Sequence, residues 1–163
     1  MNTVFPRKRA DVDLEGAPAT RDFLERHPAM WPSISSSIPP GWDDQIAGAL
    51  RSLLGLSIET GVEIRVAQIK SKFAGLRLHF DIDEDSSGPV EVDESTPIGT
   101  RLQSSSTPSV RDRAWSIVDA AVEQCATLCE RCGAPGVLRN DAAWLRIACA
   151  THAATDSRWR TPD

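Results

Sequence analysis

Hydrophobic positions change their spacing along the first half of the chain, from every third or fourth residue to every second residue. Over residues 42–54 the apolar side chains follow a helical period: Trp42, Ile46, Leu50, Leu53 and Leu54. Asp43 and Asp44 lie in the first turn of this segment, where the helix dipole favours negative charge. We therefore expect an amphipathic helix over residues 42–54.

The segment that follows alternates apolar and polar residues, which is typical of strands with one buried face. The positions expected to face inward are Val62, Ile64 and Val66, followed by Leu76, Leu78, Phe80 and Ile82. The positions expected to face outward are Glu63 and Arg65, followed by Arg77, His79 and Asp81. Because the polar segment Lys70-Ser71-Lys72 separates the two runs, an antiparallel hairpin with its turn in that segment is predicted.

A second helical period extends from about Pro108 to Leu128 and leads into a group of cysteines. Its apolar stripe consists of Val110, Ala114, Ile117, Val118, Ala121, Val122, Cys125 and Leu128. Residues 83–108 form an acidic insert before it, and residues 81–95 hold seven acidic residues and no basic one. A solvated loop is the simpler interpretation of the insert, and a contact surface for a basic partner is the alternative.

The formal net charge of −5 restricts the choice of partners. Nonspecific nucleic-acid binding depends on Lys and Arg that neutralise phosphates, so an acidic chain is poorly suited to it. An encounter with a basic protein is favoured instead. The chain has no secretory signal that we recognise and no apolar run of roughly 20 residues. We expect a cytoplasmic protein with reduced thiols and no membrane partner.

Two pairs of metal-ligating residues lie near the C-terminus. Cys129 and Cys132 are separated by two residues, and so are Cys149 and His152. A two-residue spacing lets one tight turn direct both side chains at one point, and Gly133 after the second cysteine favours that turn. Three thiolates and one imidazole suit tetrahedral zinc, and four ligands leave no open position for catalysis. The sequence therefore predicts a structural Zn²⁺ site.

The residues between these pairs predict two short strands about a polar turn. Val137-Leu138-Arg139 and Trp144-Leu145-Arg146-Ile147 are the two runs, and Asn140-Asp141 is the turn. A turn with two ligands, a hairpin, and two ligands opening a helix make up a treble clef. A zinc ribbon is the alternative if residues 150–157 are not helical.

Cys125 permits one other interpretation, because Cys125, Cys129 and Cys132 also have the spacing of a radical-SAM iron–sulfur site. The chain is too short for the barrel of those enzymes, and the pair Cys149 and His152 would have no role. Cys125 also falls on the apolar stripe of the second helix, where a cysteine packs as a small hydrophobic residue.

Two weaker candidates lie on the hairpin. His79 and Asp81 share the outward face of one strand and could form an acid–base pair, although an exposed polar face is the simpler interpretation. Lys70, Lys72 and Arg77 form a small basic patch that is a candidate contact for phosphate or for an acidic partner.

Three segments together resemble a family of small, largely uncharacterised bacterial and phage proteins. The stretch from Gln68 to Arg77, QIKSKFAGLR, resembles a VKEKFGGLRF-type segment, and Gly41-Trp42 resembles a Gly-Trp helix start. The residues that match the family's C-terminal CxxCG…W…CxxH segment are Cys129, Cys132, Gly133, Trp144, Cys149 and His152.

The resemblance covers about residues 41–82 and 111–153. It departs at Ala74, where the family usually has the glycine that a tight turn with positive φ favours, and through the acidic insert. It implies a recurring hairpin-plus-zinc architecture, often in mobile or phage-linked genomes, and it implies no activity.

The expected fold class is α+β: a helix with an antiparallel β-hairpin, a long helix, and a C-terminal treble-clef-like or zinc-ribbon-like module. Residues 1–40 are expected to form a leader with a short helix near residues 20–27 and a Pro/Ser loop. Residues 41–128 would form the core, and residues 129–157 the zinc module, packed with the core as one domain.

The leading functional hypothesis is a non-enzymatic, zinc-stabilised protein that binds another protein, such as an immunity or anti-defence factor that neutralises a basic effector. The first alternative is a nucleic-acid-binding zinc module that uses Lys70, Lys72 and Arg77 together with Arg139 and Arg146. The second alternative is a hydrolase-like enzyme that uses His79 and Asp81.

Overall fold

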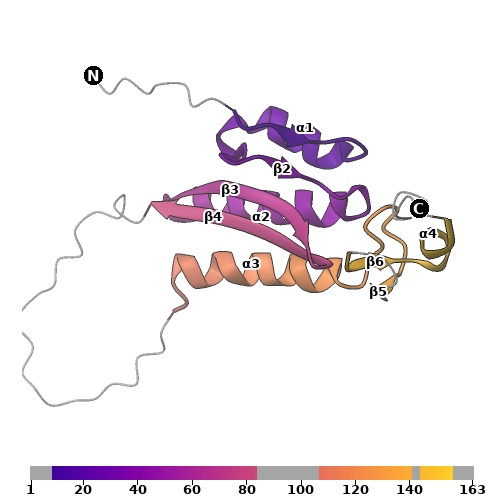
Figure 1. Cartoon of the computed structure of the whole chain (residues 1–163). Helices are drawn as coiled ribbons and strands as arrows, with labels where there is room; N and C mark the ends of the chain where they lie inside the picture. Colours follow the sequence, from indigo (N-terminus) through magenta and orange to yellow (C-terminus); the bar gives the residue numbers. More distant parts are fainter. Residues whose placement is uncertain (1–8, 84–106, 141–143, 156–163) are drawn as a thin grey trace, which may run out of the picture.

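The centre of the fold is an antiparallel β-hairpin that packs against two helices, α2 and α3 (Figure 1). The computed structural model describes residues 9–83, 107–140 and 144–155. In chain order the elements are β1 Val12–Asp13, α1 Pro18–Arg26, η1 Pro28–Met30, β2 Ser36–Ser37, η2 Pro40–Trp42, α2 Asp43–Thr60, β3 Glu63–Lys72, β4 Gly75–Asp83, α3 Val110–Cys125, β5 Val137–Arg139, β6 Arg146–Ala148 and α4 Ala150–Thr155. This is a mixed architecture of helices and small, mostly antiparallel sheets.

Helix α2 is longer than the sequence predicts. It continues past Leu54 to Thr60 and ends where Gly61 takes a left-handed conformation, with φ of 70°. Gly55 does not stop it, because the side chains on either side of that position, such as Leu53 and Leu56, remain buried. Packing of this stripe outweighs the low helix propensity of one glycine.

Helix α3 is shorter than the predicted segment from Pro108 to Leu128. It begins at Val110 after a capping box, in which Ser109 Oγ accepts a hydrogen bond from Asp112 N–H and the Asp112 carboxylate accepts one from Ser109 N–H. It ends at Cys125, before the cysteine pair. The last three residues of the predicted segment instead form a turn that leads to Cys129.

The hairpin confirms the predicted inward and outward faces. The buried or partly buried inward side chains are Val62, Ile64, Val66, Leu76, Leu78, Phe80 and Ile82. An irregularity between Val66 and Gln68 shifts the register, and it brings Ile69 to the inward face with no exposed surface.

The position of the hairpin turn was predicted wrongly. Lys70 to Lys72 belong to β3, and the turn consists of Phe73 and Ala74. Their φ values are 53° and 61°, so both adopt the left-handed conformation that a two-residue type I′ turn requires. Ala74 therefore takes a positive φ without being glycine.

The segment before α2 is packed into the core. Ala17, Phe23, Leu24, Met30 and Ile38 all have less than one tenth of their surface exposed and join the same hydrophobic cluster as α2. The segment also covers the free edge of β3, where the N–H groups of residues 33 and 34 donate to the carbonyl oxygens of residues 66 and 67.

Helix α1 starts without a capping side chain of its own. The carboxylate of Asp43, at the start of α2, accepts hydrogen bonds from the N–H groups of Ala19 and Thr20 at 2.7 and 2.8 Å. One buried acid thus satisfies N-terminal donors of α1 and fixes it against α2.

Beyond α3 the chain forms a small module of β5, β6 and α4 at one end of the molecule (Figure 1). Strands β5 and β6 pair antiparallel, which confirms the predicted second hairpin. Most of the acidic insert, residues 84–106, and Asp141 of the predicted polar turn lie outside the described residues. None of the helices in the described part has the length and apolarity needed to cross a bilayer.

Candidate metal centre

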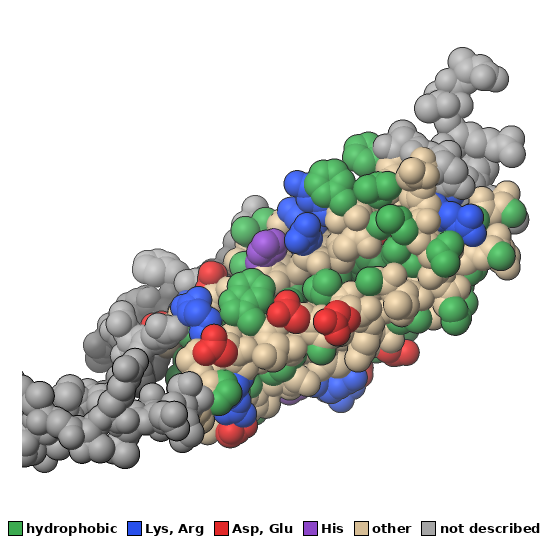
Figure 2. All heavy atoms as spheres, turned by 90° about the horizontal axis from the view of Figure 1, so that it is seen from below, with side chains coloured by type: hydrophobic (Ala, Val, Ile, Leu, Met, Phe, Trp, Pro, Cys, Tyr) green, Lys and Arg blue, Asp and Glu red, His purple; other side chains and the backbone are tan. Residues whose placement is uncertain are grey.

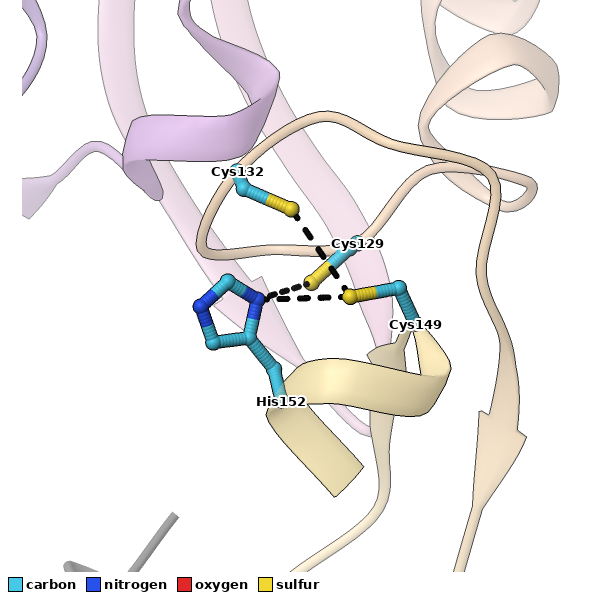
Figure 3. A group of neighbouring side chains, drawn as sticks. All are labelled: Cys129, Cys132, Cys149 and His152. Atoms are coloured by element: carbon cyan, nitrogen blue, oxygen red, sulfur yellow. Dashed lines mark hydrogen bonds between the residues drawn. The ribbon is translucent and has the colours of Figure 1, made fainter. Parts of the chain in front are cut away.

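Four side chains from two segments of the C-terminal module converge on one point (Figure 3). Cys129 and Cys132 lie on the turn that follows α3. Cys149 directly follows β6, and His152 lies in the first turn of α4. One ligand atom from each residue lies within 4.8 Å of the other three. These are the four residues that the sequence predicts, and their arrangement could hold a metal ion.

The separations agree with those of a tetrahedral metal site. Nδ1 of His152 lies 3.4 Å from the sulfur atoms of both Cys129 and Cys149, and the sulfur atoms of Cys132 and Cys149 are 3.8 Å apart. With Zn–S bonds of about 2.3 Å and a Zn–N bond of about 2.0 Å, tetrahedral geometry places ligand atoms about 3.5–3.8 Å apart. The donor set and these three separations are therefore compatible with a tetrahedral zinc ion.

A tight turn presents the first two ligands. The N–H of Gly133 donates to the carbonyl oxygen of Cys129 at 2.9 Å, and Gly133 has a φ of 72°. The N–H of Cys129 in turn donates to the carbonyl oxygen of Ala134 at 2.8 Å. Gly133 meets the left-handed requirement without strain, which is the role that the sequence assigns to it.

Backbone N–H groups prepare Cys129 to act as a thiolate. Burial by itself would raise the pKa of Cys129, but hydrogen bonds from the backbone of Cys149, Arg131 and Cys132, together with His152, lower it to about 6. The thiolate form is the form that ligates metals. This side chain is therefore ready for coordination near neutral pH.

Cys132 is the most exposed of the three cysteine ligands. Hydrogen bonding from the backbone of Ala134 lowers its pKa, but partial desolvation and the neighbouring Cys129 and Cys149 outweigh this and raise it. Three sulfur atoms so close together repel one another as thiolates, and a dication at their centre would relieve that repulsion.

The turn that carries Cys129 and Cys132, the candidate metal-binding turn, makes a close backbone contact with Gly41 in the helical core. A Cβ added to Gly41 would lie 1.9 Å from the carbonyl oxygen of Cys129 and 2.5 Å from the nitrogen of Gly133. The N–H of Gly41 donates to the carbonyl oxygen of Glu130 at 2.8 Å, and the indole of the buried Trp42 donates to the carbonyl oxygen of Leu128 at 2.9 Å. The Gly-Trp pair at the start of α2 therefore positions the metal-binding turn.

Glu130 connects this turn to two further elements. Its carboxylate accepts a hydrogen bond from the N–H of Ile147 in β6 at 3.0 Å and one from the hydroxyl of Ser71 in β3 at 3.4 Å. Desolvation raises the pKa of Glu130, while the hydrogen bonds and the charge of Arg146 oppose the shift. Sequence reasoning missed this role, because the partners are 17 and 59 residues away.

Cys125 lies outside the ligand cluster. It is fully buried at the end of α3 and packs in the hydrophobic core, and burial followed by the nearby charge of Glu130 raises its pKa to about 12. Cys149 and His152, rather than Cys125, complete the site around Cys129 and Cys132. The packing role that the sequence favours for Cys125 agrees with its position.

The weaker candidate residues fall into two groups. His79 and Asp81 are both exposed on the outward face of β4, opposite Gln68 and Arg65 of β3. Lys70 and Arg77 are direct partners across the hairpin, so the predicted basic patch is assembled.

The two arginines of the C-terminal hairpin differ in exposure. Arg139 and Arg146 are direct partners in the pairing of β5 with β6. Arg146 is only 8% exposed and its charge acts on Glu130, so it belongs to the interior of the module rather than to a contact surface.

A pocket of about 470 Å³ borders the metal centre between the module and the N-terminal segment. Its walls include Asp13, Glu15, Glu130, Arg131, Arg146 and His152. The charges have both signs, so they favour no single class of ligand. His152 and Cys129 are the two residues of the candidate metal centre that line this pocket.

Comparisons of the chain with known protein families, with curated proteins and with solved structures find no match. The resemblance of the hairpin and of the Cys/His segment to small bacterial and phage proteins thus stays a prediction.

Proposed function

We propose that the protein is a non-enzymatic binding protein whose C-terminal module is held together by one structural zinc ion. Three sulfur ligands and one imidazole fill the four positions of a tetrahedral zinc ion and leave no open coordination position for a substrate or a reactive water. A ligand-bearing turn, the β5–β6 hairpin and a helix that carries His152 have the order of a treble clef. We assign the module to that class.

The observation that carries a binding role is an apolar patch on this module. It consists of Val137, Leu138, Trp144 and Leu145, whose exposed fractions are 57, 60, 65 and 41%. Figure 2 shows exposed hydrophobic side chains along much of one face of the molecule, the module end included. Exposed apolar side chains that lie on one small module and include a tryptophan are typical of protein–protein contact sites.

The kind of partner follows from charge. A chain with a net charge of −5 attracts a basic protein and accelerates its encounter. We propose that the apolar patch supplies the buried centre of the interface and that the acidity of the chain selects a basic effector. Neutralisation of such an effector is the activity of an immunity or anti-defence factor.

The metal and the patch are coupled in this proposal. The four patch residues lie on or next to β5 and β6, and these strands are only three residues long. Such a short hairpin is not stable by itself, so the metal would fix the shape of the patch. Removal of the zinc should therefore destabilise the folded module and abolish partner binding.

The test begins with affinity purification of the tagged, zinc-loaded protein from its native host. A partner identified by mass spectrometry is then purified, and its affinity is measured by titration calorimetry. Trp144→Ser should weaken binding by about 30-fold or more, as expected for a central interface aromatic. Ile58→Ser is the matched control, because Ile58 is 74% exposed but lies at the distant end of α2.

Two results would overturn the proposal. One is recovery of nucleic acid alone from the host. The other is a partner whose affinity is unchanged by Trp144→Ser, or reduced equally by Ile58→Ser.

A further inference from the structure

The tip of the β3–β4 hairpin concentrates positive charge on an acidic protein. No acidic residue lies between Glu63 and Asp81, whereas Lys70, Lys72 and Arg77 lie close to the turn. Lys72 and Arg77 are exposed and Lys70 is half-buried. Glu63 and Asp81 lie at the opposite end of the hairpin, so positive charge lies at the tip and negative charge at the other end.

The cations at the tip form no ion pair within the described residues, although the Glu130 carboxylate accepts a hydrogen bond from Ser71 between Lys70 and Lys72. Lys70 lies directly opposite Arg77 in the strand register. Like charges directly opposite on an antiparallel pair are destabilising. A polyanion bound at the tip would relieve this repulsion.

An aromatic ring projects from the same tip. Phe73 is 67% exposed and has a φ of 53°, a conformation that asparagine and glycine adopt far more readily at this turn position. The Nζ atom of Lys72 lies 5.1 Å from the centroid of its ring. The left-handed backbone at Phe73 costs free energy, and the exposed ring gains none from burial, so their combination points to a use of the ring.

We propose that the hairpin tip binds single-stranded nucleic acid. Phe73 stacks on an unpaired base, and Lys70, Lys72 and Arg77 contact the flanking phosphates. Such a combination of aromatic platform and cationic groove is how proteins bind single strands without sequence preference. Figure 2 shows Lys and Arg side chains gathered beside exposed hydrophobic ones on one part of the surface.

The ring distinguishes this ligand from the other polyanions that three cations could attract. An acidic peptide would use the charges but not the face of Phe73. A duplex keeps its bases stacked on one another and offers the ring no free base. Both are therefore expected to bind less tightly than a single strand of equal charge.

The expected salt dependence follows from the number of cations. Three phosphate contacts on a single strand give a slope of log K against log salt of about −2. Removal of two of the cations should reduce the magnitude of the slope by about 1.4. Loss of one stacked base should weaken binding by about 5- to 150-fold.

The experiment is a fluorescence-anisotropy titration of a labelled 15-nucleotide oligo-dT with the full zinc-loaded chain across a range of salt. The test variants are Lys70→Gln/Arg77→Gln and Phe73→Asn. Asparagine suits a positive φ, so the second variant should keep or raise the thermal stability while it weakens binding. Arg51→Gln is the control, because Arg51 is an exposed cation on α2 away from the tip, and its affinity should stay within twofold of the wild type.

Three results would overturn the proposal. The first is no binding at low salt. The second is binding that either test variant leaves unchanged. The third is tighter binding of a poly-glutamate peptide or of a duplex than of the single strand. None of the variants touches the apolar patch of Trp144, so either binding proposal can fail without the other.

Discussion

At Gly41 the backbone of the helical core lies directly against the metal-binding turn. A methyl group at this position would overlap the carbonyl oxygen of Cys129 and would lie 2.8 Å from the carbonyl carbon of Glu130. These neighbours are backbone atoms and cannot rotate away as a side chain would. Gly41→Ala must therefore push the metal-binding turn away from the start of α2.

The cost can be worked from the contacts that this movement breaks. Overpacking at a well-packed site typically costs about 1–3 kcal/mol. The hydrogen bond from Gly41 N–H to the carbonyl oxygen of Glu130 contributes about 0.5–1.5 kcal/mol more. We expect Gly41→Ala to lower the free energy of unfolding by about 3 kcal/mol, with further loss if Trp42 also loses its bond to Leu128.

The same chain provides a control of opposite sign. Gly55 lies in α2, and a Cβ added there would meet nothing within 4 Å. Gly55→Ala should raise the free energy of unfolding by about 0.5–1 kcal/mol, since alanine is the better helix former. The two Gly→Ala substitutions should thus differ by about 4 kcal/mol.

The assay is urea unfolding of the zinc-saturated protein, followed by tryptophan fluorescence. With an m value of about 2 kcal/mol/M, Gly41→Ala should move the midpoint down by about 1.5 M, while Gly55→Ala should move it slightly upward. If Gly41→Ala is as stable as the wild type, the close approach of the turn to Gly41 is wrong.

Three further predictions concern single positions. Ala74→Gly should raise the free energy of unfolding, measured by urea titration, by about 0.5 kcal/mol. The reason is that relief of the left-handed strain at φ of 61° exceeds the loss of one buried methyl group. A decrease of more than about 1 kcal/mol would contradict the turn geometry. Cys125 is buried and its pKa is raised to about 12, so it should resist iodoacetamide in the folded zinc-loaded protein and react in urea. Mass spectrometry measures the modification. Modification of Cys125 in the folded protein would contradict its buried position. The folded pKa of Cys129 is about 6, below its ordinary value of 9.0, so its thiolate stabilises the fold fully above pH 9, and this contribution is lost as the pH falls through about 6. Because bound zinc keeps its thiolates deprotonated to a lower pH than in the metal-free site, a chelating dye should detect zinc release only as the pH falls below about 6. Zinc release that does not depend on pH would be inconsistent with thiolate ligation.

Local patterns were sufficient to predict part of this fold. Apolar residues alternate with polar ones in β3 and β4 and form stripes along α2 and α3. These patterns show which face of each element is buried, and they can be recognised from residues close together in the sequence. The ligand pairs were also predictable, since two-residue spacing is a local property. Their convergence required only that the chain between them form a hairpin.

What could not be predicted depends on distant partners. The hairpin turn was placed at Lys70 to Lys72 because polar residues resemble a turn, whereas the actual turn residues, Phe73 and Ala74, carry no turn signal. The cap that Asp43 provides for α1 spans more than twenty residues. The two ends of the Glu130 network are likewise brought together only by the finished fold.

The most direct test of the metal centre is zinc X-ray absorption spectroscopy on freshly purified protein of known metal content. One zinc per chain is expected, with three sulfur atoms at about 2.3 Å and one nitrogen at about 2.0 Å. Cys149→Ser should remove one sulfur from this shell or abolish binding. A sub-stoichiometric metal content, or a shell of oxygen and nitrogen alone, would contradict ligation by Cys129, Cys132, Cys149 and His152.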